Sequence, residues 1–255
     1  MNYSKVIQYG NLMEIYQYEL NPPQFTDEQR AIAKYRRLQT VSLRGTDTSG
    51  QEEQVATKRK DNARRATMAF RRLTIANLGE SSHPVFVSLT YAESTTDPRV
   101  GYKDFRTFAK RLRTAFGSDI RYVAVPEFQD KYERGSIHFH ALVWGIPPQV
   151  VESERRTRVV AKIWGKGFVD LKQTDGNHKI ASYMAKYMSK NFIDPRLFKH
   201  KSYIFSYNCL RPVVDNNAIV LSYLHEYELL TVDPLQDKEF QSQWLGKGRF
   251  RLYAI

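Results

Sequence analysis

Apolar and polar residues follow one another in patterns that predict a mixture of strands and helices. Residues 85–91, 120–127 and 135–144 are rich in β-branched and aromatic residues, which is typical of strands in a sheet. In 102–116 the apolar residues recur every three or four positions, which predicts an amphipathic helix. The other elements expected are a hairpin over 5–20 that turns at Gly10-Asn11, a short helix over 26–38, a loop over 45–54, a basic helix over 54–77, a helix over 149–164, a short strand over 168–172 and a helix over 180–191.

This succession of elements predicts an α+β fold with a central antiparallel sheet flanked by helices. The chain of 255 residues is long enough for one large domain with extensions. We expect residues 1–80 to form the N-terminal hairpin and basic helix, packed on a core domain over 81–195. Residues 196–255 form a C-terminal extension, whose strand-like runs at 203–207 and 218–224 have no place in the fold that follows from the pattern.

The charge of the chain narrows the choice of partner. The formal net charge is +12, and a surplus of this size points first to nucleic acid, although a basic surface can also serve solubility alone. Sixteen Tyr and fourteen Phe supply rings that could stack on bases, and most of them should still belong to the core. The cations that we expect to bind DNA lie on the two basic helices: Arg64, Arg65, Arg71, Arg72, Arg106, Lys110 and Arg113.

Cysteine content and terminal pattern bear on the compartment. The single Cys209 excludes an internal disulfide and any zinc site built from several cysteines, which is consistent with a reducing compartment. The first residues lack the apolar run of a signal peptide, and no apolar stretch is long enough to cross a membrane. We therefore expect a cytoplasmic protein of a bacterial or archaeal host cell, with no membrane partner.

The segment His138-Phe139-His140 carries the first candidate chemistry. Residues i and i+2 of a strand point to the same side, so the two imidazoles can share one divalent metal, Mg²⁺ or Mn²⁺. Glu127 is the expected third ligand because it ends the strand that should pair with the histidine strand, and Asp130 and Glu133 are the reserves. Two alternatives stay open. The histidines could pack without a ligand, or they could form a zinc hydrolase site, for which His83, His178, His200 and His225 have no obvious spacing.

The second candidate lies on the predicted helix over 180–191. Tyr183, Lys186, Tyr187 and Lys190 are spaced i, i+3, i+4 and i+7, so they share one helical stripe. A tyrosine hydroxyl has an ordinary pKa of about 10, and a neighbouring lysine can favour its ionised, nucleophilic form. The opposing interpretation is a helix whose tyrosines only pack against the sheet.

Together these motifs resemble the HUH endonuclease superfamily, and in particular the rolling-circle replication initiators of small single-stranded-DNA phages and related plasmids. The resemblance covers most of residues 5–212 and is specific in the order and spacing of its motifs. Its three motifs are similar to the following segments: Phe86-Val87-Ser88-Leu89-Thr90-Tyr91, then Glu127 with His138-Phe139-His140, then Tyr183-Met184-Ala185-Lys186-Tyr187-Met188-Ser189-Lys190. Lys5 to Glu19, Ile75-Ala76-Asn77 and Ser206 to Pro212 also resemble the microvirus branch.

The resemblance implies a metal-dependent, site-specific nickase and strand transferase with a 5′-phosphotyrosine intermediate. Its fold would be the HUH nuclease core, and its substrate would be single-stranded or unwound origin DNA. The chain contains no Gly-x-x-x-x-Gly-Lys-[Ser/Thr] motif, so a host helicase and a single-strand-binding protein are the expected partners. The competing interpretations are a transposase or relaxase of the same superfamily and a nucleic-acid-binding protein without enzymatic activity.

Overall fold

The computed structural model describes residues 3–24, 26–29, 32, 51–79, 83–129, 135–152, 154–192, 194–198 and 200–255. Within them, the side chains of 51–58, 154–157, 189 and 190 are left undescribed. The chain divides into two compact units. The central unit is the continuous stretch Asp61–Arg211, and the terminal unit combines Met1–Lys60 with Pro212–Ile255. Most of the helix expected over 26–38 and the tip of the hairpin at 130–134 lie outside the described residues.

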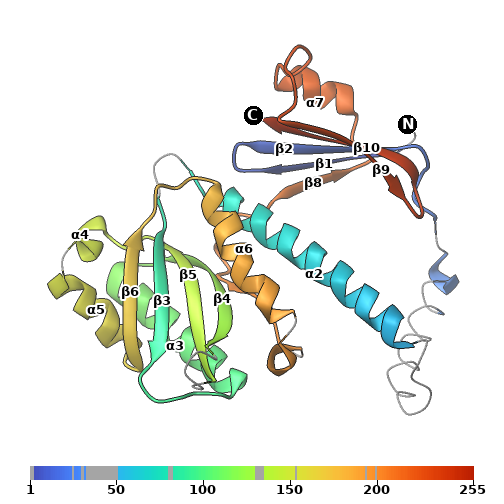
Figure 1. Cartoon of the computed structure of the whole chain (residues 1–255). Helices are drawn as coiled ribbons and strands as arrows, with labels where there is room; N and C mark the ends of the chain where they lie inside the picture. Colours follow the sequence, from blue (N-terminus) through green and yellow to red (C-terminus); the bar gives the residue numbers. More distant parts are fainter. Residues whose placement is uncertain are drawn as a thin grey trace. The chain divides into compact units, whose positions relative to one another are not determined.

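The central unit is built on a five-stranded sheet in the order β6-β3-β5-β4-β7, in which all neighbours are antiparallel (Figure 1). The strands are β3 (Val85–Tyr91), β4 (Arg121–Gln129), β5 (Ser136–Trp144), β6 (Gly167–Gln173) and the short β7 (Ile204–Phe205). Because β5 lies in the middle, it is hydrogen-bonded on both edges, and its side chains are the best shielded of the sheet.

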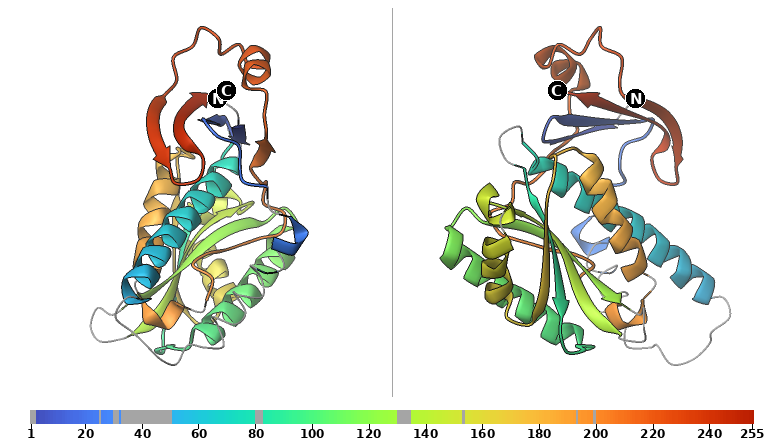
Figure 2. Two further views of the ribbon diagram at one scale, coloured as in Figure 1. Left: turned by 90° about the vertical axis from the view of Figure 1, so that its right-hand side faces the viewer. Right: turned by 60° about the vertical axis from the view of Figure 1, so that its left-hand side comes forward.

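Helices cover both faces of this sheet. Figure 2 shows α3 (Pro98–Phe116, green) and α6 (Lys179–Asn191, orange) on opposite sides of it. Beside α3 lie α4 (Pro148–Val151) and α5 (Glu154–Trp164), and a short 3-10 helix follows α6 at Pro195–Leu197. The long α2 (Gln51–Ala76) enters this unit, where Phe70 packs edge-on against Tyr203 with 5.3 Å between ring centroids. No helix among the described residues combines the length and apolarity needed to cross a membrane.

The main hydrophobic core fills the space between the sheet and the α3–α5 side. Phe105, Phe108 and Leu112 of α3 pack there against Phe139 of β5 and Trp164 of α5, and each is 2% exposed or less. Gly101 permits the close approach of α3 to β5, because a Cβ atom at this position would lie 2.9 Å from Cγ2 of Ile137. Packing on one face of the sheet therefore fixes where β5 lies.

The terminal unit joins the two ends of the chain in a second antiparallel sheet, ordered β8-β1-β2-β10-β9. Val6, Met13, Ile15 and Tyr253 on one face pack against the helix α7. The elements of this unit are β1 (Tyr3–Tyr9), β2 (Leu12–Tyr18), β8 (Val213–Asn216), α7 (Val220–Glu226), β9 (Gln236–Ser242) and β10 (Gly246–Ala254).

The structure confirms the predicted α+β class with antiparallel sheets and flanking helices, and it corrects several details. The strand-like run 218–224 was wrong, because it contains most of helix α7, whose Tyr223 and Leu224 pack on the terminal sheet. The helix expected over 149–164 is two helices, α4 and α5, and the expected loop over 45–54 is already helical from Gln51. The first and last of the three expected segments meet in one unit, because β8 and β10 pair with β1 and β2.

Candidate active site

The two histidines of β5 point away from the main core. Ile137, Phe139 and Ala141 are fully buried on the α3 side, whereas His138 and His140 face α6. This alternation follows from the two-residue period of a strand, because the odd-numbered side chains are claimed by the core. The predicted common face of the imidazoles is present in the structure.

Strand β4 sets oxygen atoms opposite both imidazoles. Glu127 is the cross-strand partner of His138, but its carboxylate reaches diagonally to His140, with 2.9 Å between Oε2 and Nε2. The Nε2 atom of His138 lies 2.6 Å from Oε1 of Gln129. Each imidazole thus has its own oxygen partner from β4.

Strand β3 holds the other nitrogen of each ring. The Ser88 hydroxyl lies 3.2 Å from Nδ1 of His140, and the Thr90 hydroxyl lies 3.2 Å from Nδ1 of His138. A hydroxyl can donate or accept a proton, so it can fix ring orientation in either tautomer. Both imidazoles are consequently bonded on both sides, between a hydroxyl of β3 and an oxygen of β4.

This donor set fits a hard divalent cation. Two imidazole nitrogens, one carboxylate and one amide oxygen belong to the ligand types that Mg²⁺ and Mn²⁺ accept, and the hydroxyls on Nδ1 provide the outer contacts typical of histidine ligands. Among the described residues no three His, Cys, Asp or Glu side chains converge, because His138 is paired with the amide of Gln129. The reserve ligands Asp130 and Glu133 lie outside the described residues.

Helix α6 brings its tyrosines onto the same site. The hydroxyls of Tyr183 and Tyr187 lie 2.8 Å apart, and the ring of Tyr187 stacks on His140 with 3.9 Å between centroids. Phe86 of β3 packs beside both His140 and Tyr183. The two candidate motifs therefore form one cluster, in which the tyrosine pair sits directly over the Glu127–His140 pair.

Electrostatics around the pair disfavour an ionised Tyr187. Burial raises the pKa of Tyr187 well above its ordinary value, and the hydrogen bond to Tyr183 and the negative charge of Glu127 raise it further. Tyr183 is 44% exposed, so it is the member of the pair that solvent reaches more easily. In this geometry Tyr187 holds its proton until a positive charge is brought near.

The packing of α6 explains why the tyrosines face the site. Ala181, Met184, Ala185 and Met188 are buried, and the helix lies along β4. The apolar stripe expected over Ile180, Met184 and Met188 is therefore present, with Ile180 only half-buried. Lys186 is exposed and makes no hydrogen bond or ion pair with either tyrosine among the described residues, and the side chain of Lys190 lies outside them.

The structure separates the cations that we expected on DNA. On α2, Arg64, Arg65 and Arg71 are exposed and Arg72 is partly buried. Arg106, Lys110 and Arg113 of α3 lie on the other side of the sheet from the tyrosines. The α3 cations are thus not part of the histidine–tyrosine cluster.

Three polar residues of this cluster were not predicted from the sequence. Gln129 stands two residues after Glu127, and Ser88 and Thr90 stand two residues apart. The signal was the same two-residue period that identified the histidines, applied to the neighbouring strands. Outside the cluster, the amide of Asn77 exchanges hydrogen bonds of 3.0 and 2.9 Å with the backbone of Leu210, which joins the end of α2 to the segment after β7.

Comparison with known protein families bears on the same part of the chain. Residues 84–192 match the model of a family described as Replication-associated protein ORF2. The matched span runs from the start of β3 to the end of α6, so it contains Glu127, both histidines and both tyrosines. No curated protein and no solved structure matched the chain. The family match supports a replication-associated protein of the Rep type.

Proposed function

We propose that the chain initiates rolling-circle replication, as a site-specific endonuclease and strand transferase of single-stranded DNA from the HUH superfamily, of the microvirus type. The observation that carries the proposal is the contact between Tyr187 and His140, which joins a tyrosine hydroxyl pair to a carboxylate–imidazole pair. A tyrosine without such surroundings is a poor nucleophile at neutral pH.

The reaction would be a transesterification at one phosphodiester. The oxygen of Tyr183 or Tyr187 forms a bond to phosphorus, the bond from phosphorus to the 3′ oxygen breaks, and the 3′ oxygen takes up a proton. The tyrosine proton can leave through the 2.8 Å contact between the two hydroxyls, with the exposed Tyr183 as the outlet to solvent. The 5′ phosphate stays on the protein as an ester, so reversal by a free 3′ hydroxyl rejoins the strand.

The cation-binding residues would be Glu127, His138 and His140, with Gln129 beside them. When bound, Mg²⁺ or Mn²⁺ would polarise the scissile phosphate and offset the charge that develops on it. Ser88 and Thr90 orient the two imidazoles from behind. Lys186 and Lys190 are the residues that could attract the DNA backbone to α6, and Arg64, Arg65, Arg71 and Arg72 extend this role to α2.

The experiment that tests the proposal is a search for the covalent adduct. Single-stranded oligonucleotides from a candidate origin are incubated with the full chain and Mn²⁺, and the products are resolved on a denaturing gel. We expect a protein–DNA adduct that is lost in the Tyr183→Phe/Tyr187→Phe double variant and with chelator. Tyr203→Phe is the matched control, because it removes a hydroxyl from a half-buried ring of the same unit that packs on Phe70.

The single variants assign the nucleophile. If the tyrosines alternate, Tyr183→Phe and Tyr187→Phe each retain some adduct, and mass spectrometry finds the DNA on the remaining tyrosine. If one tyrosine performs all the chemistry, its single variant matches the double variant. Nicking by the double variant would exclude a tyrosine nucleophile and leave an activated water in its place.

A further inference from the structure

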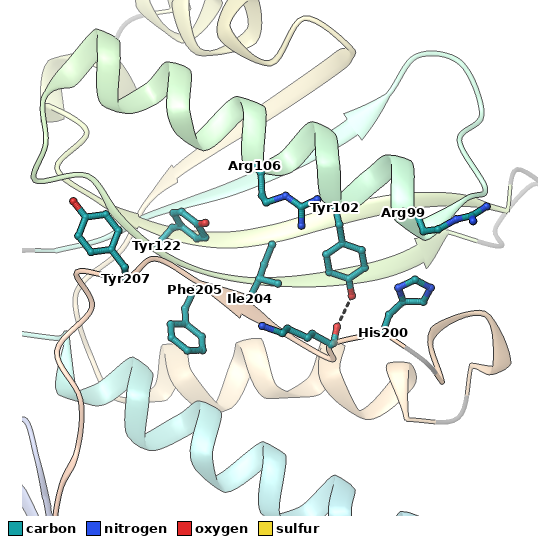
Figure 3. A pocket seen from close by; sticks show the side chains of 9 residues that line it. Arg99, Tyr102, Arg106, Tyr122, His200, Ile204, Phe205 and Tyr207 are labelled. Atoms are coloured by element: carbon teal, nitrogen blue, oxygen red, sulfur yellow. Dashed lines mark hydrogen bonds between the residues drawn. The ribbon is translucent and has the colours of Figure 1, made fainter. Parts of the chain in front are cut away.

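A second site of the central unit lies away from the tyrosines. A cleft of about 560 Å³ opens between α3 and the segment 200–207, which runs along the edge of β4 (Figure 3). Tyr122 of β4 lies in its wall, on the face of the sheet that carries the main core. The proposed nucleophiles lie on the opposite face, so the cleft is separate from the candidate active site.

The cleft carries positive charge without a local counter-charge. None of its lining residues is acidic. Arg99 is occupied by a two-pronged ion pair with Asp97, with contacts of 2.9 and 3.2 Å. Arg106 and Lys201 remain, and neither side chain makes a hydrogen bond or ion pair with any residue that the structure describes. Two unpaired cations at one opening are the features that bind phosphate oxygens.

The same cleft presents aromatic rings in fixed positions. Tyr102 stacks on His200 with 5.6 Å between centroids, and its hydroxyl donates to the carbonyl of Lys201. Tyr207 is 78% exposed, and the guanidinium of Arg113 lies 4.9 Å from its ring centroid. The Arg113 side chain is itself held by Asn208 and by the carbonyl of Ile120. A large exposed ring held this way is suited to stacking on a nucleobase.

We propose that this cleft is an accessory subsite for single-stranded DNA, which binds nucleotides outside the cleaved phosphodiester. Arg106 and Lys201 contact the phosphate, and the exposed face of Tyr207 stacks on a base. The cleft volume lies within the range of sites that enclose small ligands, which suits one or two nucleotides. The choice of DNA as ligand rests on the proposed function, whereas the cleft, its cations and its rings do not.

The test measures binding, so that it does not depend on cleavage. Fluorescein-labelled dT oligomers of increasing length are titrated with the full chain, and anisotropy gives Kd at several salt concentrations. For Arg106→Gln/Lys201→Gln we expect the log–log salt slope of the longer oligomers to flatten by up to about 1.4, because single strands lose about 0.7 per phosphate contact. The matched control is Lys103→Gln/Lys162→Gln, which removes two charges from exposed lysines of α3 and α5 outside the cleft.

The ring is tested by a separate pair of variants. We expect Tyr207→Ala to weaken binding of the longer oligomers about fivefold or more at every salt concentration, since stacking is insensitive to salt. Tyr207→Phe keeps the ring and should bind as the unchanged protein does. Melting temperatures of all variants confirm that they are folded.

The outcomes separate this inference from the proposed function. Cleft variants that bind dT oligomers as the lysine control does would overturn the subsite, even in a protein that forms the tyrosine adduct. Loss of binding in the cleft variants would support the subsite, even where no adduct is found. Binding of dTMP as tightly as a long oligomer, or equal competition by polyglutamate, would also overturn it, in favour of a free-nucleotide site or a general anion surface.

Discussion

The two faces of the central sheet share the same strands and differ in almost every other respect. On the α3 side, Phe139 and its neighbours on β5 are fully buried among apolar side chains. On the α6 side, His138 and His140 are only partly exposed, yet each ring nitrogen meets a polar atom. The first face depends on filled volume, and the second depends on individual atoms.

This difference shows how a strand can carry both stability and chemistry. Successive residues of β5 alternate between the faces, so Phe139 positions the strand while the residues on either side of it serve the site. A slip of one residue in the pairing of β4 and β5 would bury the imidazoles and expose Phe139. The apolar face therefore protects the register on which the polar face depends.

The largest expected effect on stability comes from Phe139. Its ring lies 4.9 Å from that of Phe105, and truncation of such a buried ring costs about 3–5 kcal/mol in the free energy of unfolding. The neighbouring His140→Ala should cost only about 1 kcal/mol, because it removes hydrogen bonds at a partly exposed position. Urea denaturation of both variants checks the contrast. Equal losses would mean that the polar face is as structural as the core.

The next effect concerns the carboxylate. Glu127→Gln keeps the shape of the side chain and removes its charge, so we expect the Mn²⁺ titration midpoint, followed by the rise in melting temperature, to move at least about tenfold higher. Gln129→Leu is the companion variant and tests the amide oxygen next to His138. An unchanged midpoint in Glu127→Gln would transfer the role of ligand to Asp130 or Glu133.

A smaller effect is expected from the hydroxyls of β3. Ser88→Ala and Thr90→Val leave the ligand atoms in place and remove only the contacts to Nδ1 of the histidines. Outer contacts of this kind are worth about tenfold or more in metal affinity. The control is Thr107→Val on the exposed side of α3. If the Ser88 and Thr90 variants titrate like the control, the histidine rings are oriented by β4 alone.

The smallest effect is a change in the pKa of Tyr187. Burial keeps this pKa raised, and the hydrogen bond and charge of Tyr183 add to it. Tyr183→Phe removes the second contribution, so the pKa of Tyr187 should fall while it stays above its ordinary value. NMR titration of tyrosines labelled at Cζ measures it. Because the folded-state pKa is raised, Tyr187 stabilises the fold below about pH 10, and that stabilisation is lost as the pH rises beyond it.

The sequence predicts the central unit much better than the terminal unit, for a physical reason. Strand β3 was predicted with its observed bounds, Val85–Tyr91, because it is buried on both faces and reads as a continuous apolar run. In β9, Phe240 is the only apolar residue, so the strand has no periodicity to read. It forms because β10 offers a free edge, and pairing along an edge needs no apolar side chains.

The site itself was predictable as far as its period reaches. His138, His140 and Glu127 were chosen by strand alternation and hairpin pairing, and the register of β4 with β5 agrees with that choice. The diagonal contact from Glu127 to His140 depends on side-chain rotamers, which no sequence pattern contains. The run 218–224 was misread because seven residues are too few to separate the period of a strand from that of a helix.

The insertion of the central unit into the terminal unit has a consequence for synthesis on the ribosome. Residues 61–211 are continuous, so their sheet can assemble while the end of the chain is still being made. The terminal sheet must wait, because Leu12 of β2 pairs with Ala254 of β10. At about 5–20 residues per second, synthesis from the first of these residues to the second takes roughly 10 to 50 s. Throughout that time the hairpin β1–β2 has an unpaired edge, so the nascent chain is exposed to mispairing there while its chemistry-bearing part is made and folds.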